Sequence, residues 1–239
     1  MTDESLMKRA FDAERAEGYD REFEALRAVK DLLHLLLRVQ FSTLPAHARI
    51  LVAGAGTGAE VRFLARHFPD WRFTLADPAP GMLAVAERHA NAEGFADRCE
   101  FHEGYVGSLP RDLHDAATSI LVSQFLTDSA ARQSYFEDIA ARLKPGALLF
   151  NADLSADRSA ATFERTMDLW LEMMQYAAAA RGAEPNAHGD RPSFRDLFGK
   201  VVAAHDPAEV EALMTRAGFT ELVPCYQAVL IRAWFARRA

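Results

Sequence analysis

Short apolar runs alternate with amphipathic stretches through the first two thirds of the chain. The runs have the length of buried strands, and the stretches between them repeat apolar residues at helical spacing. The predicted strands are 49–54, 72–77, 99–103, 116–123 and 147–151, and the predicted helices are 58–68, 80–92 and 128–143. This alternation predicts an α/β fold with a doubly wound, mostly parallel sheet.

The pattern changes at both ends of this alternating region. Residues 3–42 read as helices that precede the first strand. After Asp153, residues 156–181 predict one long helix, and 193–217 predict two more. Residues 219–236 predict two strands joined by a turn near 224–227, forming an antiparallel hairpin at the sheet edge. We therefore expect a single domain over 1–239, with N-terminal helices in 1–45 and a helical cap in 156–205. A last helix and the hairpin fill 206–239.

Composition narrows the class of protein. The chain has 239 residues, of which 50% are hydrophobic, and its net charge is -7. An acidic chain argues against nucleic acid as a partner. Cys99 and Cys225 match no metal-ligand spacing, so we expect free thiols and no metal. No apolar run is long enough for a membrane span and the N-terminus lacks a signal pattern, which predicts a cytoplasmic protein.

The stretch 49–60 carries the strongest chemical signal. An apolar strand leads through Gly54, Gly56 and Gly58 into a helix, an arrangement that brings bare backbone close to a ligand. The next strand ends in Asp77, where a carboxylate can accept hydrogen bonds from ribose hydroxyls. Together these features predict a site for a nucleoside-containing cofactor in 46–155. The glycine spacing also fits a dinucleotide fingerprint, so it does not choose the cofactor.

Several further segments occur in a characteristic order. They are Ile50-Leu-Val-Ala-Gly-Ala-Gly-Thr-Gly58, Leu75-Ala-Asp-Pro-Ala-Pro-Gly-Met-Leu83, Ser108-Leu-Pro110, Arg142-Leu-Lys-Pro-Gly-Ala-Leu-Leu149 and Ala217-Gly-Phe219. Over roughly residues 15 to 236, the chain resembles the class I S-adenosylmethionine-dependent methyltransferases. The resemblance implies a Rossmann-like sheet of seven strands with an antiparallel C-terminal strand. It also implies S-adenosyl-L-methionine as the cofactor.

The resemblance assigns residues to this cofactor by position. The glycine loop would approach the methionine part, Asp77 would hold the ribose, and a tyrosine from the N-terminal helices would lie over the cofactor. Residues after the third strand would border the adenine, and those after the fourth would lie beneath the sulfonium. The set is Tyr19, Gly54, Ala55, Gly56, Gly58, Asp77, Pro78, Met82, Gly104, Tyr105, Val106, Ile120, Ser123 and Gln124.

Two positions depart from the family pattern. Most members carry an acid two residues before the first loop glycine, where this chain has Val52. The position after Gly104, often Asp, is Tyr105. Both changes remove polar contacts to the cofactor's amino groups, and Glu60 or Glu103 are the acids that could compensate.

The singled-out residues also have purely structural interpretations. Asp77 could cap the helix that follows, and Tyr19 could be an ordinary half-buried tyrosine. Trp170 and Met174 could line a substrate pocket, although their helical spacing is typical of a core stripe. Arg195 could bind an anion above the site or form a salt bridge.

No catalytic motif is visible, which is compatible with methyl transfer because that reaction depends mainly on positioning. Weak candidates for a general base are His102, Asp153 and His188. The leading hypothesis is transfer of a methyl group to O or N of a small-molecule acceptor, by a chain that could form a homodimer. The layout also resembles carboxy-S-adenosylmethionine synthase, which modifies the cofactor itself. A non-catalytic protein that binds S-adenosylmethionine or NAD is a further alternative.

Overall fold

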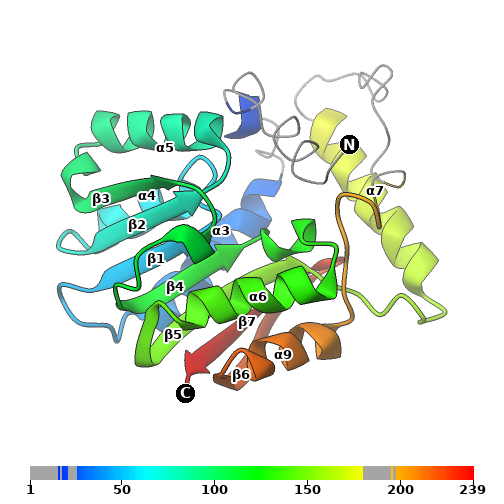
Figure 1. Ribbon diagram of the computed structural model, residues 1–239. Helices are drawn as coiled ribbons and strands as arrows, with labels where there is room; N and C mark the ends of the chain where they lie inside the picture. The colour runs from blue at the N-terminus through cyan, green and yellow to red at the C-terminus, as the bar shows by residue number, and fades with distance from the viewer. Residues whose placement is uncertain (1–15, 17, 21–25, 180–194, 196–197) are drawn as a thin grey trace.

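The computed structural model describes residues 16, 18–20, 26–179, 195 and 198–239. These residues build a seven-stranded sheet in the order β3-β2-β1-β4-β5-β7-β6. The strands β1 to β5 pair in parallel, and β7 runs antiparallel to both of its neighbours, β5 and β6. The order reverses between β1 and β4, which is where open α/β sheets bind their ligands. The predicted fold class is confirmed (Figure 1).

The observed elements follow the predicted alternation closely. The strands are β1 Arg49–Ala53, β2 Arg72–Asp77, β3 Cys99–Glu103, β4 His114–Ile120, β5 Leu143–Leu154, β6 Phe219–Ala228 and β7 Ile231–Arg238. The helices are α3 Arg27–Phe41, α4 Ala59–His67, α5 Pro80–Ala92, α6 Ser129–Ala140, α7 Phe163–Ala179 and α9 Pro207–Arg216. Short 3₁₀ turns are η2 Ala96–Arg98, η3 Val106–Ser108 and η4 Ser123–Phe125.

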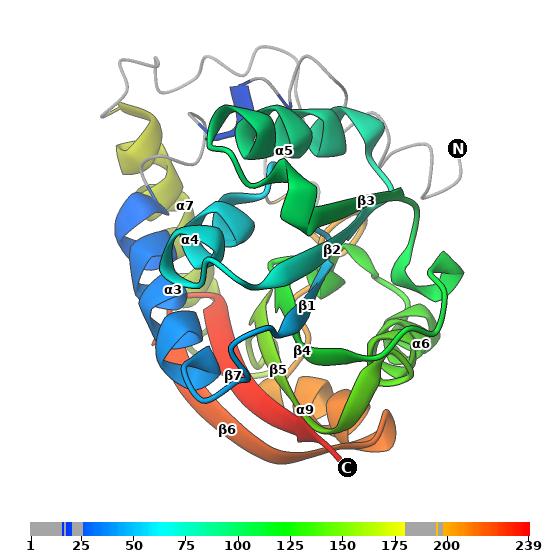
Figure 2. The same ribbon diagram turned by 90° about the vertical axis from the view of Figure 1, so that its left-hand side faces the viewer.

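Alternate residues of the central strands feed two separate cores. Ile50 and Val52 of β1 pack under α3, α4 and α5, whereas Leu51 and Ala53 pack under α6 and α9. All four side chains are fully buried. Because both faces of the sheet are covered, its central strands read as unbroken apolar runs rather than as alternating ones. Figure 2 shows these two groups of helices on opposite sides of the sheet.

A third apolar cluster lies at the carboxyl edge of the sheet. Trp170 and Met167 of α7 pack there with Leu154 from the end of β5 and Ile231 from the start of β7. Figure 1 shows α7 beyond the strand ends rather than on a sheet face. Helix α7 therefore lies over the edge of the sheet where the ligand is expected.

Two predicted details are wrong. The long helix begins at Phe163 rather than at residue 156, because Asp157 accepts hydrogen bonds from the backbone N–H and hydroxyl of Ser159 and closes a turn first. The hairpin turn lies at Val229 and Leu230, not near 224–227. Pro224 remains inside β6, where the edge position and a nearby register shift accommodate it.

The helices in the described part of the chain include none that is both long enough and apolar enough to cross a membrane.

Candidate functional site

The glycine loop between β1 and α4 has a left-handed backbone at all three glycines. The φ values are +71° at Gly54, +53° at Gly56 and +76° at Gly58. A Cβ on Gly54 would lie 2.5 Å from a methyl group of Val122, so this glycine permits close packing against the end of β4. A Cβ on Gly56 would meet nothing within 4 Å. Gly56 thus borders open space that a ligand can enter, which fits the predicted cofactor cradle.

Asp77 at the end of β2 is bonded directly to this loop. Its Oδ2 accepts a hydrogen bond from Gly56 N at 2.8 Å, and its Oδ1 accepts one from Ala79 N at 2.8 Å. Burial raises the pKa of the Asp77 carboxyl, and these two backbone hydrogen bonds oppose that shift. Each carboxylate oxygen can accept a second hydrogen bond, so the group can still bind hydroxyls. Asp77 therefore organises the turn before α5 and remains equipped to bind a ribose.

The described residues before α3 lie against the same loop. Asp20 accepts a hydrogen bond from the Thr57 hydroxyl at 2.7 Å. Tyr19 packs against a small cluster that contains Ala16, Ala79 and Met82. Ala16 and Tyr19 thus lie against the start of α5, and Tyr19 lies beside Met82, one of the positions that the sequence predicted for the cofactor.

The loop after β3 is held in place by Arg142, which follows α6. Arg142 donates from Nη2 to the carbonyl oxygens of Gly107 at 2.7 Å and Leu109 at 2.6 Å. At the start of this loop, Gly104 N donates to Asp77 O at 3.0 Å. These bonds place Gly104 beside the end of β2, with Val106 buried and Tyr105 exposed. They also give the Arg142 motif a physical role, which is to fix the loop expected to border the adenine.

The end of β4 is locked to β5 by a buried network. Asp153 of β5 accepts hydrogen bonds from the Ser123 hydroxyl, from Gln124 N and from the Asn151 amide. The Gln124 side chain in turn accepts a bond from Leu154 N at 2.9 Å. Ser123 and Gln124 are therefore buried supports of η4, while Ile120 is half-buried at the strand end.

The backbone just before this network is strained. Leu121 has a φ of +59°, a region that non-glycine residues rarely adopt. The turn that it forms brings Val122 against Gly54. Such strain persists only where the surroundings enforce it, and it is frequent at ligand sites.

Three buried acids gather around the carboxyl ends of the central strands. Asp77 comes from β2, Asp153 from β5 and Glu60 from the first turn of α4, and each is at most 8% exposed. Burial is the main cause that raises the pKa of all three. Burial also raises the pKa of Tyr135, and the charges of all three acids add to that shift. The described residues offer no Lys, Arg or His within ion-pair distance of Glu60 or Asp77.

The proposed general bases differ in their exposure and in their hydrogen-bond partners. His102 Nε2 lies 2.8 Å from the Ser108 hydroxyl, which itself donates to Tyr105 O. Asp153 has no solvent exposure and uses its oxygens in the network that supports η4. His188 lies outside the described residues. The base therefore stays a prediction.

The proposed substrate residues lie on the cap. Trp170 is buried in the third apolar cluster, and Met174 packs half-buried against that cluster. Arg195 is exposed and forms ion pairs with Glu164 at 2.7 Å and Asp168 at 2.8 Å, both on α7. Helix α7 thus presents apolar side chains toward the strand ends and pairs its exposed acids Glu164 and Asp168 with Arg195.

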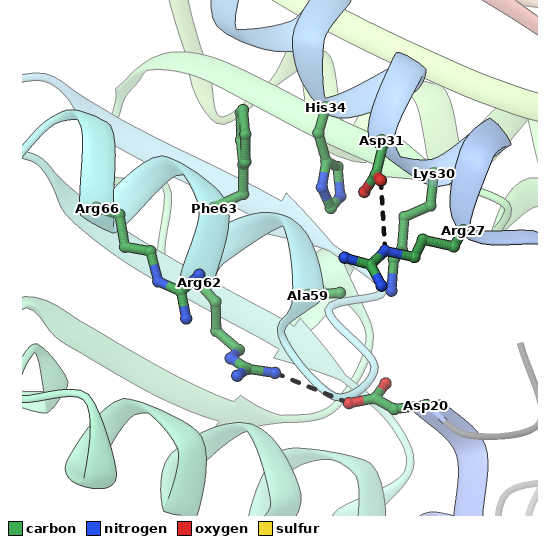
Figure 3. Close-up of a pocket in the computed structure, with 9 residues that line it drawn as sticks. All are labelled: Asp20, Arg27, Lys30, Asp31, His34, Ala59, Arg62, Phe63 and Arg66. Atoms are coloured by element: carbon green, nitrogen blue, oxygen red, sulfur yellow. Dashed lines mark ion pairs between the residues drawn. The ribbon is translucent and has the colours of Figure 1, made fainter. Parts of the chain in front are cut away.

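A pocket of about 400 Å³ opens between α3 and α4 (Figure 3). Asp77 is not among its lining residues, which are Asp20, Arg27, Lys30, Asp31, His34, Ala59, Arg62, Phe63 and Arg66. Several of its cations already have acidic partners. Arg62 and Arg66 both pair with Glu93, and Arg27 pairs with Asp31. This pocket lies on the outer side of the glycine loop and does not form the predicted cofactor cradle.

Comparison with known proteins supports the assignment of the fold and of the glycine loop. Residues 50–146 match the family model of a methyltransferase domain. This match runs from β1 to the first residues of β5. This part of the chain therefore matches a methyltransferase domain, in agreement with the resemblance to the class I S-adenosylmethionine-dependent methyltransferases.

Individual relatives extend the similarity. The chain is 26% identical over 243 residues to an uncharacterized methyltransferase of Emericella nidulans, covering 91% of this chain and 77% of that one. It is 30% identical over 100 residues to malonyl-[acyl-carrier protein] O-methyltransferase of Bacillus cereus, covering 42% of this chain and only 36% of the relative. The S-adenosylmethionine-dependent methyltransferase SibL shares its fold, with a TM-score of 0.62 and 18% identity over 89% of this chain and 56% of SibL.

Sequence reasoning missed several contacts of this candidate site. The bond from Thr57 to Asp20 joins positions 37 residues apart, and the packing of Val122 on Gly54 joins two loops. The structure also separates the two acids considered as replacements for the missing one. Glu60 is buried at the loop, whereas Glu103 is exposed at the end of the edge strand β3. The sequence did contain one signal that pointed to Glu60, namely a carboxylate in the first helical turn after the glycines.

Proposed function

We propose that this chain transfers a methyl group from S-adenosylmethionine to an oxygen or nitrogen atom of a small-molecule acceptor. The observation that carries the proposal is the gathering of buried carboxyl groups around the glycine loop. Glu60 and Asp77 lie there without an ion-pair partner among the described residues. A ligand that brings positive charge into this site would be stabilised by both groups.

The same charges argue against a nicotinamide dinucleotide. A pyrophosphate in this kind of loop is bound by backbone N–H groups at the helix N-terminus. Here Glu60 occupies the first turn of α4, and the Gly56 N–H is already donated to Asp77. A buried carboxylate beside a pyrophosphate would repel it strongly, because screening by water is weak there. S-adenosylmethionine carries a sulfonium and an ammonium group instead, so its charge complements the site.

The chain's residues would hold the cofactor as follows. Asp77 would accept hydrogen bonds from the ribose hydroxyls through the acceptor sites that Gly56 and Ala79 leave open. The loop at Gly104 would border the adenine, since Gly104 N donates to Asp77 O at the end of β2. Gly56 would admit the methionine part, because it adjoins open space.

The reaction requires alignment more than acid–base chemistry. When bound, S-adenosylmethionine supplies an electrophilic methyl group: an acceptor lone pair forms the new bond while the carbon–sulfur bond breaks, its electron pair returns to sulfur, and the acceptor's proton leaves to solvent. The network of Ser123, Gln124 and Asp153 would fix the end of β4 beneath the reacting atoms. The cap would exclude water, and its apolar underside at Trp170 would favour a partly aromatic acceptor.

A direct test uses labelled S-adenosylmethionine with a panel of phenols, amines and carboxylic acids. We expect one class of acceptor to gain the labelled methyl group, with S-adenosylhomocysteine formed in equal amount. The Asp77→Asn variant serves as the control and should lose most of this activity. Mass spectrometry of the ligand that co-purifies with the protein completes the test. A carboxylated derivative of the cofactor would contradict methyl transfer and favour cofactor modification.

A further inference from the structure

The strand that leads into the glycine loop has no acid to offer the cofactor. Val52 is fully buried in β1, where it pairs with Leu75 of β2 and Thr118 of β4. An apolar residue here cannot bind an ammonium group. If the chain binds S-adenosylmethionine, the charge of the methionine ammonium requires another partner.

Glu60 is the acid nearest to this loop along the chain. It follows Gly58 by two residues, in the first turn of α4, and is only 7% exposed. It belongs to the buried side of the helix together with Val61 and Leu64, so its side chain lies on the sheet side of α4. Within the described ranges, no basic side chain forms an ion pair with it.

The Glu60 carboxyl interacts electrostatically with groups at the carboxyl ends of the central strands. Burial, with a smaller contribution from the charge of Asp77, raises the pKa of Glu60 to about 7. The charge of Glu60 also contributes to the raised pKa of Tyr135. Tyr135 belongs to α6, which covers the face of the sheet opposite α4. A group felt by both Asp77 and Tyr135 lies near the carboxyl ends of the central strands. The charge of Asp153 contributes to the same shift, and Arg132 is a further charged group near Tyr135.

We propose that Glu60 receives the ammonium group of the cofactor's methionine part and thereby replaces the acid that is missing at Val52. This inference rests on the proposed function. The other candidate, Glu103, is exposed at the end of the edge strand β3, away from the glycine loop. A buried carboxyl without a counter-charge destabilises the free protein, and a bound ammonium would remove that penalty.

A purely structural role for Glu60 predicts the opposite behaviour. Its carboxylate accepts a hydrogen bond from its own backbone N–H, and an acid in the first turn favours the helix dipole. If that were its whole function, replacing the acid would weaken the fold and leave ligand affinity unchanged.

The experiment is isothermal calorimetry with S-adenosylmethionine and S-adenosylhomocysteine, which share the ammonium but differ in the sulfonium. Glu60→Gln should weaken both ligands about tenfold, and Glu60→Asp should recover part of the loss. Glu103→Gln is the matched control and should bind like the original protein. Near pH 7 the original protein should also release protons on binding, because the ammonium favours the ionised carboxyl. Glu60→Gln should release no protons on binding. Proton release is measured by comparing the binding enthalpies in buffers of different ionisation enthalpy.

The outcomes separate this inference from the proposed function. If the original protein binds both ligands and Glu60→Gln binds them equally well, with the same proton release, the inference is wrong and the proposed function stands. A loss confined to S-adenosylmethionine would overturn the assignment to the ammonium, since it would place Glu60 against the sulfonium. If the original protein binds neither ligand, both proposals fall. Circular dichroism of each variant confirms that it is folded.

Discussion

The cofactor half and the cap are built in different ways. In the cofactor half, most of the predicted groups lie in short continuous stretches, and longer-range bonds such as the one from Gly56 N to Asp77 Oδ2 join these stretches. For example, Asp77 bonds to Ala79, two residues on, and the glycine loop is a continuous stretch. The cap is assembled from distant pieces: Ala203 N donates to Gln124 O, Arg132 donates to Ala203 O, and Ser155 donates to His205 O.

Under the proposed function, this difference separates the residues that would hold the cofactor from those that would select the acceptor. Local backbone geometry fixes the first, so few residue choices are compatible with it. Long-range packing and exposed ion pairs fix the second, and such contacts tolerate substitution. We therefore expect changes in the cofactor half to abolish binding, and changes on the outside of the cap to leave it intact.

The largest effect should come from Asp77. Asp77→Ala removes charge-assisted hydrogen bonds worth roughly 1.5–3 kcal/mol each, so affinity for S-adenosylmethionine should fall about 100-fold. It also frees the Gly56 and Ala79 N–H groups, so unfolding in urea must be measured beside calorimetric binding. Affinity that stays unchanged in a folded Asp77→Ala variant would remove this residue from the site.

A pH effect of nearly the same size should come from Glu60. Because its pKa rises from 4.5 to about 7 in the folded protein, its contribution to stability is complete below about pH 4.5 and is lost as pH rises to 7. The loss corresponds to about 3 kcal/mol at most. Glu60→Gln should therefore gain stability relative to the original protein between pH 5 and pH 8, measured by urea unfolding at both values. A constant difference would show that Glu60 is not buried as described.

The two glycines Gly54 and Gly56 should respond differently to alanine. In Gly54→Ala, the new Cβ would lie 2.5 Å from Val122. We expect a loss of about 2 kcal/mol in stability, partly relieved by Val122→Ala. Gly56→Ala adds only backbone strain of about 1 kcal/mol, but it places a methyl group in the ligand's space. Thermal unfolding and cofactor binding of both variants separate the packing role of Gly54 from the ligand-binding role of Gly56. If the two variants weaken cofactor binding equally, this assignment of roles is wrong.

The smallest effect should come from the outside of the cap. Arg195→Ala breaks two exposed ion pairs with α7, and such pairs contribute under about 1 kcal/mol. Stability and cofactor affinity should be nearly unchanged. If cofactor affinity falls several-fold instead, the cap is part of the cofactor site and the distinction between the two regions fails.

Much of the cofactor half could be predicted from sequence because its signals are local. Glycines with left-handed backbone, a strand ending in Asp77 and a proline at the start of α5 each impose a definite geometry. The apolar runs of β1 and β2 indicated that both faces of these strands are buried, as the structure shows. For these elements, the sequence pattern and the structure describe the same constraint.

The remaining details depend on contacts that no local pattern encodes. The turn at Asp157 delays α7 because a side chain competes with the helical backbone. Pro224 resembled a turn signal, yet the edge position of β6 tolerates it within a strand. The burial of Glu60 likewise follows from how α4 lies on the sheet, and the spacing of charges alone does not reveal it.

The central claim is that the buried acids select a cationic nucleoside cofactor. Calorimetric titration of the unmodified protein with S-adenosylmethionine and, separately, with NAD tests it most directly. The account predicts saturable binding of one S-adenosylmethionine per chain and no binding of NAD. Tight binding of NAD with no response to S-adenosylmethionine would contradict it.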